Sequence, residues 1–191
     1  QSYLTIFDAL LGYLLQLIGE GYTFEEAYDK MYERNYFGMS MVEQGDADAF
    51  ITGLYTKYSN TIKVAKDVIG IREGYNTFGT MHILNTQKGI FYIADTLINR
   101  HPDQDVLVDI AKLSAGTVKF FNEEPVMAML SYSNFGTDAQ GSPVKVKNAV
   151  DAMQKEFPDL AIDGEMQVNY ALNKSIKQYW VMIQKEVIRE I

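Results

Sequence analysis

The chain has 191 residues, of which 47% are hydrophobic, and it carries a formal net charge of -8. This length and apolar content suit one domain with its own core, while an acidic surface would repel nucleic acid. The absence of cysteine excludes disulfides, thiol catalysis and cysteine-based metal sites, and no apolar run reaches the roughly 18–20 residues of a membrane span. We therefore expect a cytoplasmic protein without nucleic-acid or membrane partners.

The first predicted element is a helix over residues 3–18, where apolar residues recur at helical spacing. Its apolar surface covers more than one side, so we expect it to be buried on more than one side. Gly19 and Gly21 end it. Four of its side chains are predicted to lie at an interface: Phe7, Leu11, Leu14 and Leu15.

A series of short elements follows this helix. Thr23 is a good N-cap residue, and Glu25 and Glu26 suit the positive end of a helix that reaches about Arg34. The next predicted elements are a shorter helix over 38–44, a short buried strand over 49–54 and a helix over 59–68.

The second half of the chain alternates strands and helices. The turn Gln87-Lys88-Gly89 joins two predicted strands, 78–86 and 90–95, and is the clearest hairpin signal in the sequence. The later predicted elements are a helix over 103–121, a strand over 126–132, a helix from Pro143 to about 156, a strand over 160–163, and helices over 166–172 and 175–191. This alternation predicts an α/β fold, a three-layer sandwich with helices on both faces of a mixed sheet that contains one hairpin.

The loop Ser131-Tyr132-Ser133-Asn134-Phe135-Gly136 follows a predicted buried strand and leads toward a helix. Such loops are where α/β proteins place ligand sites, and the unpaired N–H groups of a helix start favour anions. The alternative is that Ser and Asn only satisfy a tight turn. The residues predicted to hydrogen-bond a phosphate or a thioester carbonyl are Ser131, Ser133, Asn134, Gly136, Ser142 and, at the end of another strand, Thr96.

The remaining titratable residues predict neither catalysis nor a metal site. Asp163 and Glu165 are of the type that does acid–base work, but we interpret them as caps of a helix that begins near residue 166. His82 and His101 each lack a second histidine nearby, so they predict no histidine-based zinc site. We therefore assign no catalytic residue and no metal ligand to the chain.

Several short motifs carry a family resemblance. They are Tyr36-Phe37-Gly38-Met39 followed by residues 45–49 (GDADA), then 94–96 (ADT), 109–111 (DIA), 126–133 (VMAMLSYS) and 163–167 (DGEMQ). In their order and spacing, residues 20–173 resemble the phosphate acetyltransferase family. Within that family they look most like the phosphotransacetylase-like C-terminal region of large hybrid bacterial NADP-dependent malic enzymes.

The resemblance implies a domain that binds a ligand and assembles, without turnover of its own. Members of the family have two α/β domains with a cleft for acetyl-CoA or acetyl phosphate, and this chain looks like one of the two. The family's catalytic Ser-Arg pair and following Asp belong to the other domain, and nothing here matches them. In the hybrid malic enzymes this region is thought to sense acetyl-CoA and to build the oligomer, while NADP and a divalent metal belong to the malic-enzyme part.

The two ends differ from the usual flanks of that family. Residues 1–19 and 174–191 are apolar or amphipathic, and the sequence lacks an initiator Met. We interpret these ends as a natural variant or as excised or engineered helices, with Trp180 and Ile183 added to the predicted interface. We expect a homo-oligomer or association with the rest of a parent enzyme; the alternatives are a self-contained monomer, a fragment of an active phosphate acetyltransferase, or an engineered scaffold that presents its terminal helices.

Overall fold

A computed structural model describes residues 2–87, 89–95 and 97–172, with side chains described from residue 8 onward. The chain divides into two compact units, Gln1–Glu73 and Gly74–Ile191, whereas the sequence predicts one domain over 1–191 with a core at 20–173 and flanking helices. The predicted helix over 175–191, with Trp180 and Ile183, lies outside the described residues, as does Thr96.

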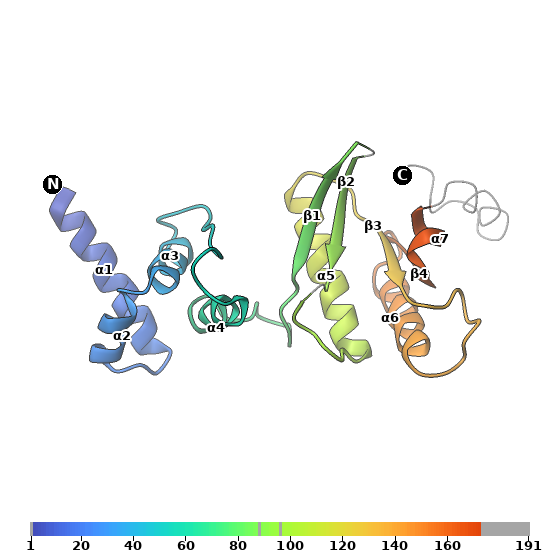
Figure 1. Cartoon of the computed structure of the whole chain (residues 1–191), viewed down its shortest axis with the longest axis horizontal. Helices are drawn as coiled ribbons and strands as arrows, with labels where there is room; N and C mark the ends of the chain where they lie inside the picture. The colour runs from blue at the N-terminus through green and yellow to red at the C-terminus, as the bar shows by residue number, and fades with distance from the viewer. Residues whose placement is uncertain (1, 88, 96, 173–191) are drawn as a thin grey trace. The chain divides into compact units, whose positions relative to one another are not determined.

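The first unit is made of helices, drawn in blue to green in Figure 1. They are α1 (Ser2–Gly19), α2 (Phe24–Lys30), α3 (Arg34–Glu43) and α4 (Tyr58–Val68). α1 packs against each of the other three. Thr23 caps α2 in a capping box, in which its hydroxyl accepts from the N–H of Glu26 and the Glu26 carboxylate accepts from the N–H of Thr23. The four predicted helices of this region are present, but α2 ends at Lys30 and not at about Arg34, and α3 begins at Arg34 and not at residue 38.

The apolar core of the first unit gathers side chains from all four helices. Its buried members are Leu14, Leu17, Ala27, Tyr36, Met39, Val64 and Val68. The interface prediction required Leu14 to lie on a free surface. Leu14 is only 5% exposed and belongs to this core. Leu11 and Leu15 lie on the exposed side of α1, with exposed fractions of 43% and 59%. Association through these two side chains stays a prediction.

A cluster of polar side chains joins three segments of the first unit. The carboxylate oxygen Oδ2 of Asp67 in α4 accepts hydrogen bonds from the hydroxyls of Tyr22, at 2.8 Å, and Tyr36, at 2.6 Å. The ammonium group of Lys30 donates to the Tyr36 hydroxyl at 3.0 Å and lies over the Tyr22 ring. Asp67 therefore links α4 to α3 and to the turn before α2.

The predicted buried strand over 49–54 is wrong, because the segment is an exposed loop. Ile51 and Leu54 are 96% and 84% exposed. The loop is held to α3 by polar side chains instead, since the hydroxyl of Thr52 donates to the buried amide oxygen of Asn35 at 2.6 Å. Phe50 packs against the core of the first unit, whereas Ile51 and Leu54 stay exposed, because an apolar run predicts burial only where a partner surface is available.

The second unit contains strands and helices in alternation. Its elements are β1 (Met81–Thr86), β2 (Gly89–Ala94), α5 (Gln104–Phe120), β3 (Val126–Leu130), α6 (Ser142–Glu156), β4 (Ala161–Met166) and the short α7 (Val168–Leu172). The hairpin predicted around residue 88 is confirmed, with β1 and β2 antiparallel and Thr86 opposite Gly89. Asp103 caps α5, since its carboxylate accepts from the N–H of Val106 at 2.9 Å.

The mixed α/β class is confirmed, but the strands do not form one mixed sheet. Among the described residues β1 pairs with β2 and β3 pairs in parallel with β4, which gives two sheets of two strands. β2 contacts α5, whereas β3 and β4 contact α6 and share a core cluster with Ala111 of α5. The three-layer sandwich therefore stays a prediction.

The core of the second unit lies between α5, α6 and one face of the β3–β4 sheet. Ala111, Met153 and Ile162 are buried there. Met127 and Met129 of β3 pack against them, while Val126 and Leu130 on the other face of the strand are exposed. This alternation is typical of a strand that is covered on one side.

No helix in the described part of the chain is long and apolar enough to cross a membrane.

Candidate functional site

The candidate site is the loop of residues 131–141 between β3 and α6, called here the β3–α6 loop. Its first residues continue along β4, because the N–H of Ser131 donates to the carbonyl oxygen of Met166 at 2.9 Å. The N–H of Phe135 donates to the carbonyl oxygen of Glu165 at 2.8 Å. The loop is therefore bound to β4 and does not project freely.

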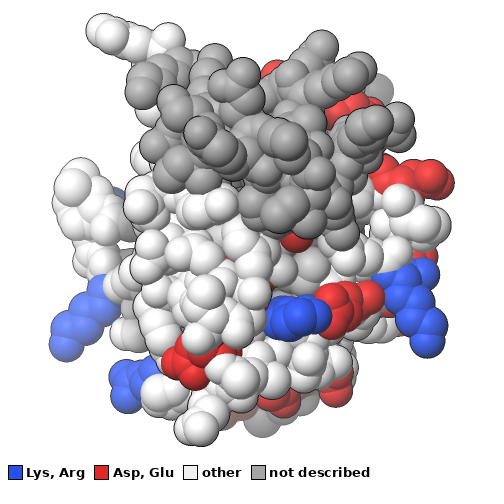
Figure 2. All heavy atoms as spheres, turned by 90° about the vertical axis from the view of Figure 1, so that its right-hand side faces the viewer, with Lys and Arg blue, Asp and Glu red and all other residues white. Residues whose placement is uncertain are grey.

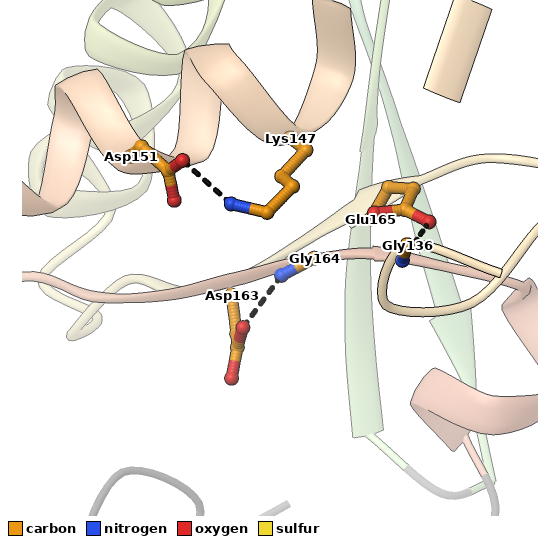
Figure 3. Close-up of polar contacts among 6 residues, drawn as sticks. All are labelled: Gly136, Lys147, Asp151, Asp163, Gly164 and Glu165. Carbon is orange, nitrogen blue, oxygen red and sulfur yellow. Dashed lines mark hydrogen bonds and ion pairs between the residues drawn. The ribbon is translucent and has the colours of Figure 1, made fainter. Parts of the chain in front are cut away.

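Glu165 holds the loop through its side chain as well. It is 0% exposed, and its carboxylate oxygen Oε1 accepts from the Ser133 hydroxyl at 2.8 Å and from the Gly136 N–H at 2.9 Å. Figure 3 shows the Gly136 contact and how the loop lies beside the strand. The interpretation of Glu165 as a helix cap is therefore wrong: the residue lies inside a strand and binds a neighbouring loop.

The strand pairing explains how Glu165 comes to face the loop. Met129 of β3 lies opposite Gly164, but the next residue, Leu130, lies opposite Met166. Glu165 is thus an extra residue without its own partner in β3, as in a β-bulge, which re-aims the side chain at the bulge. Spacing in the sequence does not reveal such an insertion.

Gly164 lets the two strands approach closely at this irregular position. A Cβ atom on Gly164 would lie 2.5 Å from the carbonyl oxygen of Met129, and its φ of 146° is one that side chains rarely adopt. Only glycine fits without moving the backbone of β3. The glycine between the two acidic residues is therefore a requirement of the packing.

The other side of the loop is bound to the residues after β4. The amide oxygen of Asn134 accepts from the N–H of Gln167 at 2.9 Å, and the Gln167 amide donates to the carbonyl oxygen of Tyr132 at 2.6 Å. The ring of Phe135 contacts that of Tyr170 in α7 edge to face, with 5.4 Å between ring centroids. Loop residues 132–135 are thus bound on both sides.

Asp163 is also buried but does not face the loop. In Figure 3 its side chain points away from Gly136, and its carboxylate accepts from the adjacent Gly164 N–H at 2.8 Å. Burial raises the pKa of Asp163, and the hydrogen bond from Gly164 opposes this shift only in part. Asp163 is therefore not a helix cap either, and the two acidic residues do not form an acid–base pair on one ligand.

The loop ends where α6 begins, with backbone donors left over. Gly141 at the N-cap has a φ of 64°, and no side chain of the described residues caps the helix. Pro143 has no N–H, so the donors of the first turn without a helical partner are those of Ser142 and Val144. Such N–H groups favour an anion. The exposed Ser142 adds a hydroxyl at the same place.

The structure separates the predicted ligand residues into two groups. Ser133, Asn134 and Gly136 already use a hydroxyl, an amide oxygen and an N–H to fix the loop. Ser142 is exposed, and Ser131 is half-buried with its hydroxyl oxygen accepting at 3.4 Å from the N–H of Ser133. Ligand contact by any of them stays a prediction, and Thr96 lies outside the described residues.

Two residues that organise the loop were missed as such in the sequence. The sequence predicts a helix cap for Glu165 and assigns Gln167 only to a family motif, although each binds the loop with its side chain. The sequence signal for such a role is a polar residue within or directly after a buried strand, and both residues have this position relative to β4. Buried polar side chains need hydrogen-bond partners, which directs attention to nearby loops.

Charges around this unit are mixed in sign. On the face shown in Figure 2, Lys and Arg side chains lie among Asp and Glu side chains and do not gather in one patch. Lys147 and Asp151 of α6, also drawn in Figure 3, form an exposed ion pair at 2.6 Å. Within residues 2–87, 89–95 and 97–172, no group of three or more His, Asp or Glu side chains is placed to hold a metal ion.

Comparison with known proteins identifies the family. Residues 8–182 match the family described as phosphate acetyl/butaryl transferase. The chain belongs to this family. It is 40% identical over 140 residues to the NADP-dependent malic enzyme of Escherichia coli, a match that covers 73% of this chain and 18% of that enzyme. It is 33% identical over 156 residues to the phosphate acetyltransferase of Bacillus subtilis, covering 82% of this chain and 48% of that enzyme.

Solved structures agree with this assignment. A phosphotransacetylase from Streptococcus pyogenes matches 95% of this chain with a TM-score of 0.77 and 28% identity, over 55% of its own length. The EutD phosphotransacetylase from Staphylococcus aureus matches 90% with a TM-score of 0.73 and 26% identity, over 53% of its length. The chain thus spans about half of these phosphotransacetylases and under a fifth of the malic enzyme of E. coli. The resemblance inferred from the motifs is confirmed.

Proposed function

We propose that this chain is a non-catalytic domain that binds acetyl-CoA or acetyl phosphate and takes part in oligomer assembly within a malic enzyme. The observation that carries the proposal is the β3–α6 loop, which is fixed by Glu165 and ends at an uncapped helix start with the exposed Ser142. Phosphate groups are anions, and unpaired N–H groups at a helix start bind anions. The greater identity to the malic enzyme of E. coli than to the phosphate acetyltransferase of B. subtilis supports the choice of parent.

The binding step would use few charged side chains. Lys145, in the first turn of α6, already donates to the carbonyl oxygen of Pro102 at 2.5 Å. The contacts left for a phosphate or a thioester carbonyl are backbone N–H groups and the hydroxyls of Ser131 and Ser142. Malate decarboxylation, NADP and the divalent metal would belong to the rest of the parent enzyme. Ligand binding would change that reaction only if the ligand favours one arrangement of subunits over another.

Binding and assembly are tested together by calorimetric titration and by light scattering after size exclusion. Acetyl-CoA, CoA and acetyl phosphate are titrated separately, so that a phosphate contact and a thioester contact can be told apart. Ser142→Ala is expected to weaken binding by roughly 10- to 100-fold, as for the loss of one hydrogen bond to a charged group. Thr117→Ala, which removes an exposed hydroxyl on α5 of the same unit, is the matched control. Absence of binding of all three ligands to the unmodified chain would overturn the proposal.

A second function, as part of an active phosphate acetyltransferase, is favoured by the family match over residues 8–182. It requires the Ser-Arg…Asp element that the resemblance places in the other domain. The discriminating measurement is formation of acetyl-CoA from acetyl phosphate and CoA. Turnover by the chain would support this second function, whereas ligand binding without turnover supports the first.

A further inference from the structure

Glu165 is the fully buried charged side chain that the proposed ligand contacts do not include. It is 0% exposed in β4, and burying a carboxylate is costly unless hydrogen bonds replace the lost water. Both bonds it receives come from the β3–α6 loop, from Ser133 and Gly136. The cost of burial is thus offset only when the loop has this one conformation.

The same residue binds the loop a third time through its backbone. Its carbonyl oxygen accepts from the N–H of Phe135, between the two residues that its side chain binds. Ser133, Phe135 and Gly136 therefore all donate to one residue of the neighbouring strand. Phe135 and Gly136 both have positive φ values, 47° and 80°, which these contacts hold in place.

The second carboxylate oxygen of Glu165 is buried as well. Oε2 has no hydrogen-bond partner among the residues that the structure describes. Oε1 alone thus carries the contact with the loop. An amide at this position would keep one acceptor oxygen but put an NH₂ group where no acceptor is described. Glu165→Gln therefore removes the charge of this side chain while keeping its shape.

We propose that Glu165 is the positioning residue of the ligand site. It fixes residues 133–136 so that the loop presents Ser142 and the first turn of α6 to the anionic ligand, and it does not touch the ligand itself. This role rests on the proposed function for its ligand, acetyl-CoA or acetyl phosphate. The hold on the loop, in contrast, rests only on the contacts given above.

The test compares Glu165→Gln and Glu165→Ala with the control Asp163→Asn. Asp163 is a buried carboxylate two residues away in the same strand, and it does not contact the loop. Amide hydrogen exchange is measured in the loop and, as an internal reference, in α5. Acetyl-CoA and acetyl phosphate affinities are measured by calorimetry on the same samples.

Glu165→Gln is expected to raise exchange at Phe135 and Gly136 by about 10-fold and to weaken ligand affinity by about 10-fold, with α5 exchange unchanged. Asp163→Asn should change neither. The double variant Ser133→Ala/Glu165→Gln should weaken affinity by less than the sum of the two single variants. The reason is that the two side chains share one hydrogen bond, which can be lost only once.

Equal effects of Asp163→Asn and Glu165→Gln on the loop, or unchanged loop exchange in Glu165→Gln, would overturn the proposal. If Glu165→Ala fails to fold, the Gln variant decides. If the unmodified chain binds neither ligand, the proposed function fails, and the exchange measurement still decides whether Glu165 holds the loop.

Discussion

Asp67 in the first unit and Glu165 in the second are both carboxylates that accept two hydrogen bonds on one oxygen, but they join different kinds of structure. Asp67 is half-buried and accepts from the hydroxyls of Tyr22 and Tyr36, which joins α4 to α3 and to the turn before α2. Glu165 is fully buried and accepts from a loop. The same chemistry therefore serves helix packing in one unit and the shape of a candidate site in the other.

The consequence lies in what each contact can tolerate. Tyr36 on α3 and Tyr22 in the turn before α2 both pack with the apolar core of the first unit, so the packing remains when a hydroxyl is lost. Apart from the ring contact of Phe135 with Tyr170, the contacts described for the β3–α6 loop are mostly polar and join it to β4 and the residues that follow it. We therefore expect a lost hydrogen bond at Asp67 to have only a modest effect on stability, and one at Glu165 to have a larger effect on ligand binding.

The largest difference between the units is expected from adding one methyl group at a glycine. In Gly164→Ala the new Cβ would lie 2.5 Å from the backbone oxygen of Met129 and would require a positive φ, which we expect to cost about 3 kcal/mol. In Gly38→Ala the Cβ would lie 2.3 Å from the ring of Phe50, which can move, and alanine favours the helix, so the cost should be about 1 kcal/mol. Urea unfolding measures both, and a larger loss for Gly38→Ala would contradict this reasoning.

The two units should also respond to pH in opposite ways. Burial acts to raise the pKa of Asp67, but hydrogen bonds from Tyr36 and Tyr22 outweigh it, so the pKa is lowered. Its stabilising contribution is therefore present above the unfolded pKa of about 3.9 and is lost as pH falls through the folded value. For Asp163, burial raises the pKa, so its contribution is present at low pH and is lost as pH rises through the folded value.

We therefore expect Asp67→Asn to reduce the free energy of unfolding by about 1 kcal/mol at pH 7, and by less at pH 3. Asp163→Asn should leave the protein at least as stable as the unmodified chain at pH 7. Thermal unfolding across pH, with amide exchange to assign each change to its unit, is the measurement. A loss on Asp67→Asn that stays constant from pH 7 to pH 3 would show that the charge is not the cause.

The smallest expected differences between the units come from the helix caps, where the two units should behave alike. Thr23→Ala removes the capping box of α2, and Asp103→Ala removes the bond to the N–H of Val106 at the start of α5. Each should cost about 1 kcal/mol, with little effect on ligand binding. Thr23→Ser and Asp103→Asn, which keep an acceptor oxygen, should recover most of that loss in the same unfolding measurement.

The sequence by itself determined the local elements and the family. Helical spacing, the cap Thr23 and the hairpin turn act over a few residues, so their outcome can be predicted without knowing the rest of the chain. The motifs over residues 20–173 identified the family for the same reason, since they are read directly from the order of residues.

Only the tertiary structure decided which of these side chains meet. The bulge that aims Glu165 at the loop, the burial of Leu14 and the exposure of Ile51 each depend on elements distant in sequence. A pattern along the chain states what a residue could contact, but burial and hydrogen bonding depend on which surface is packed against it. For that reason the loop of residues 131–136 was predictable as a candidate site, and the strand residue that holds it was not.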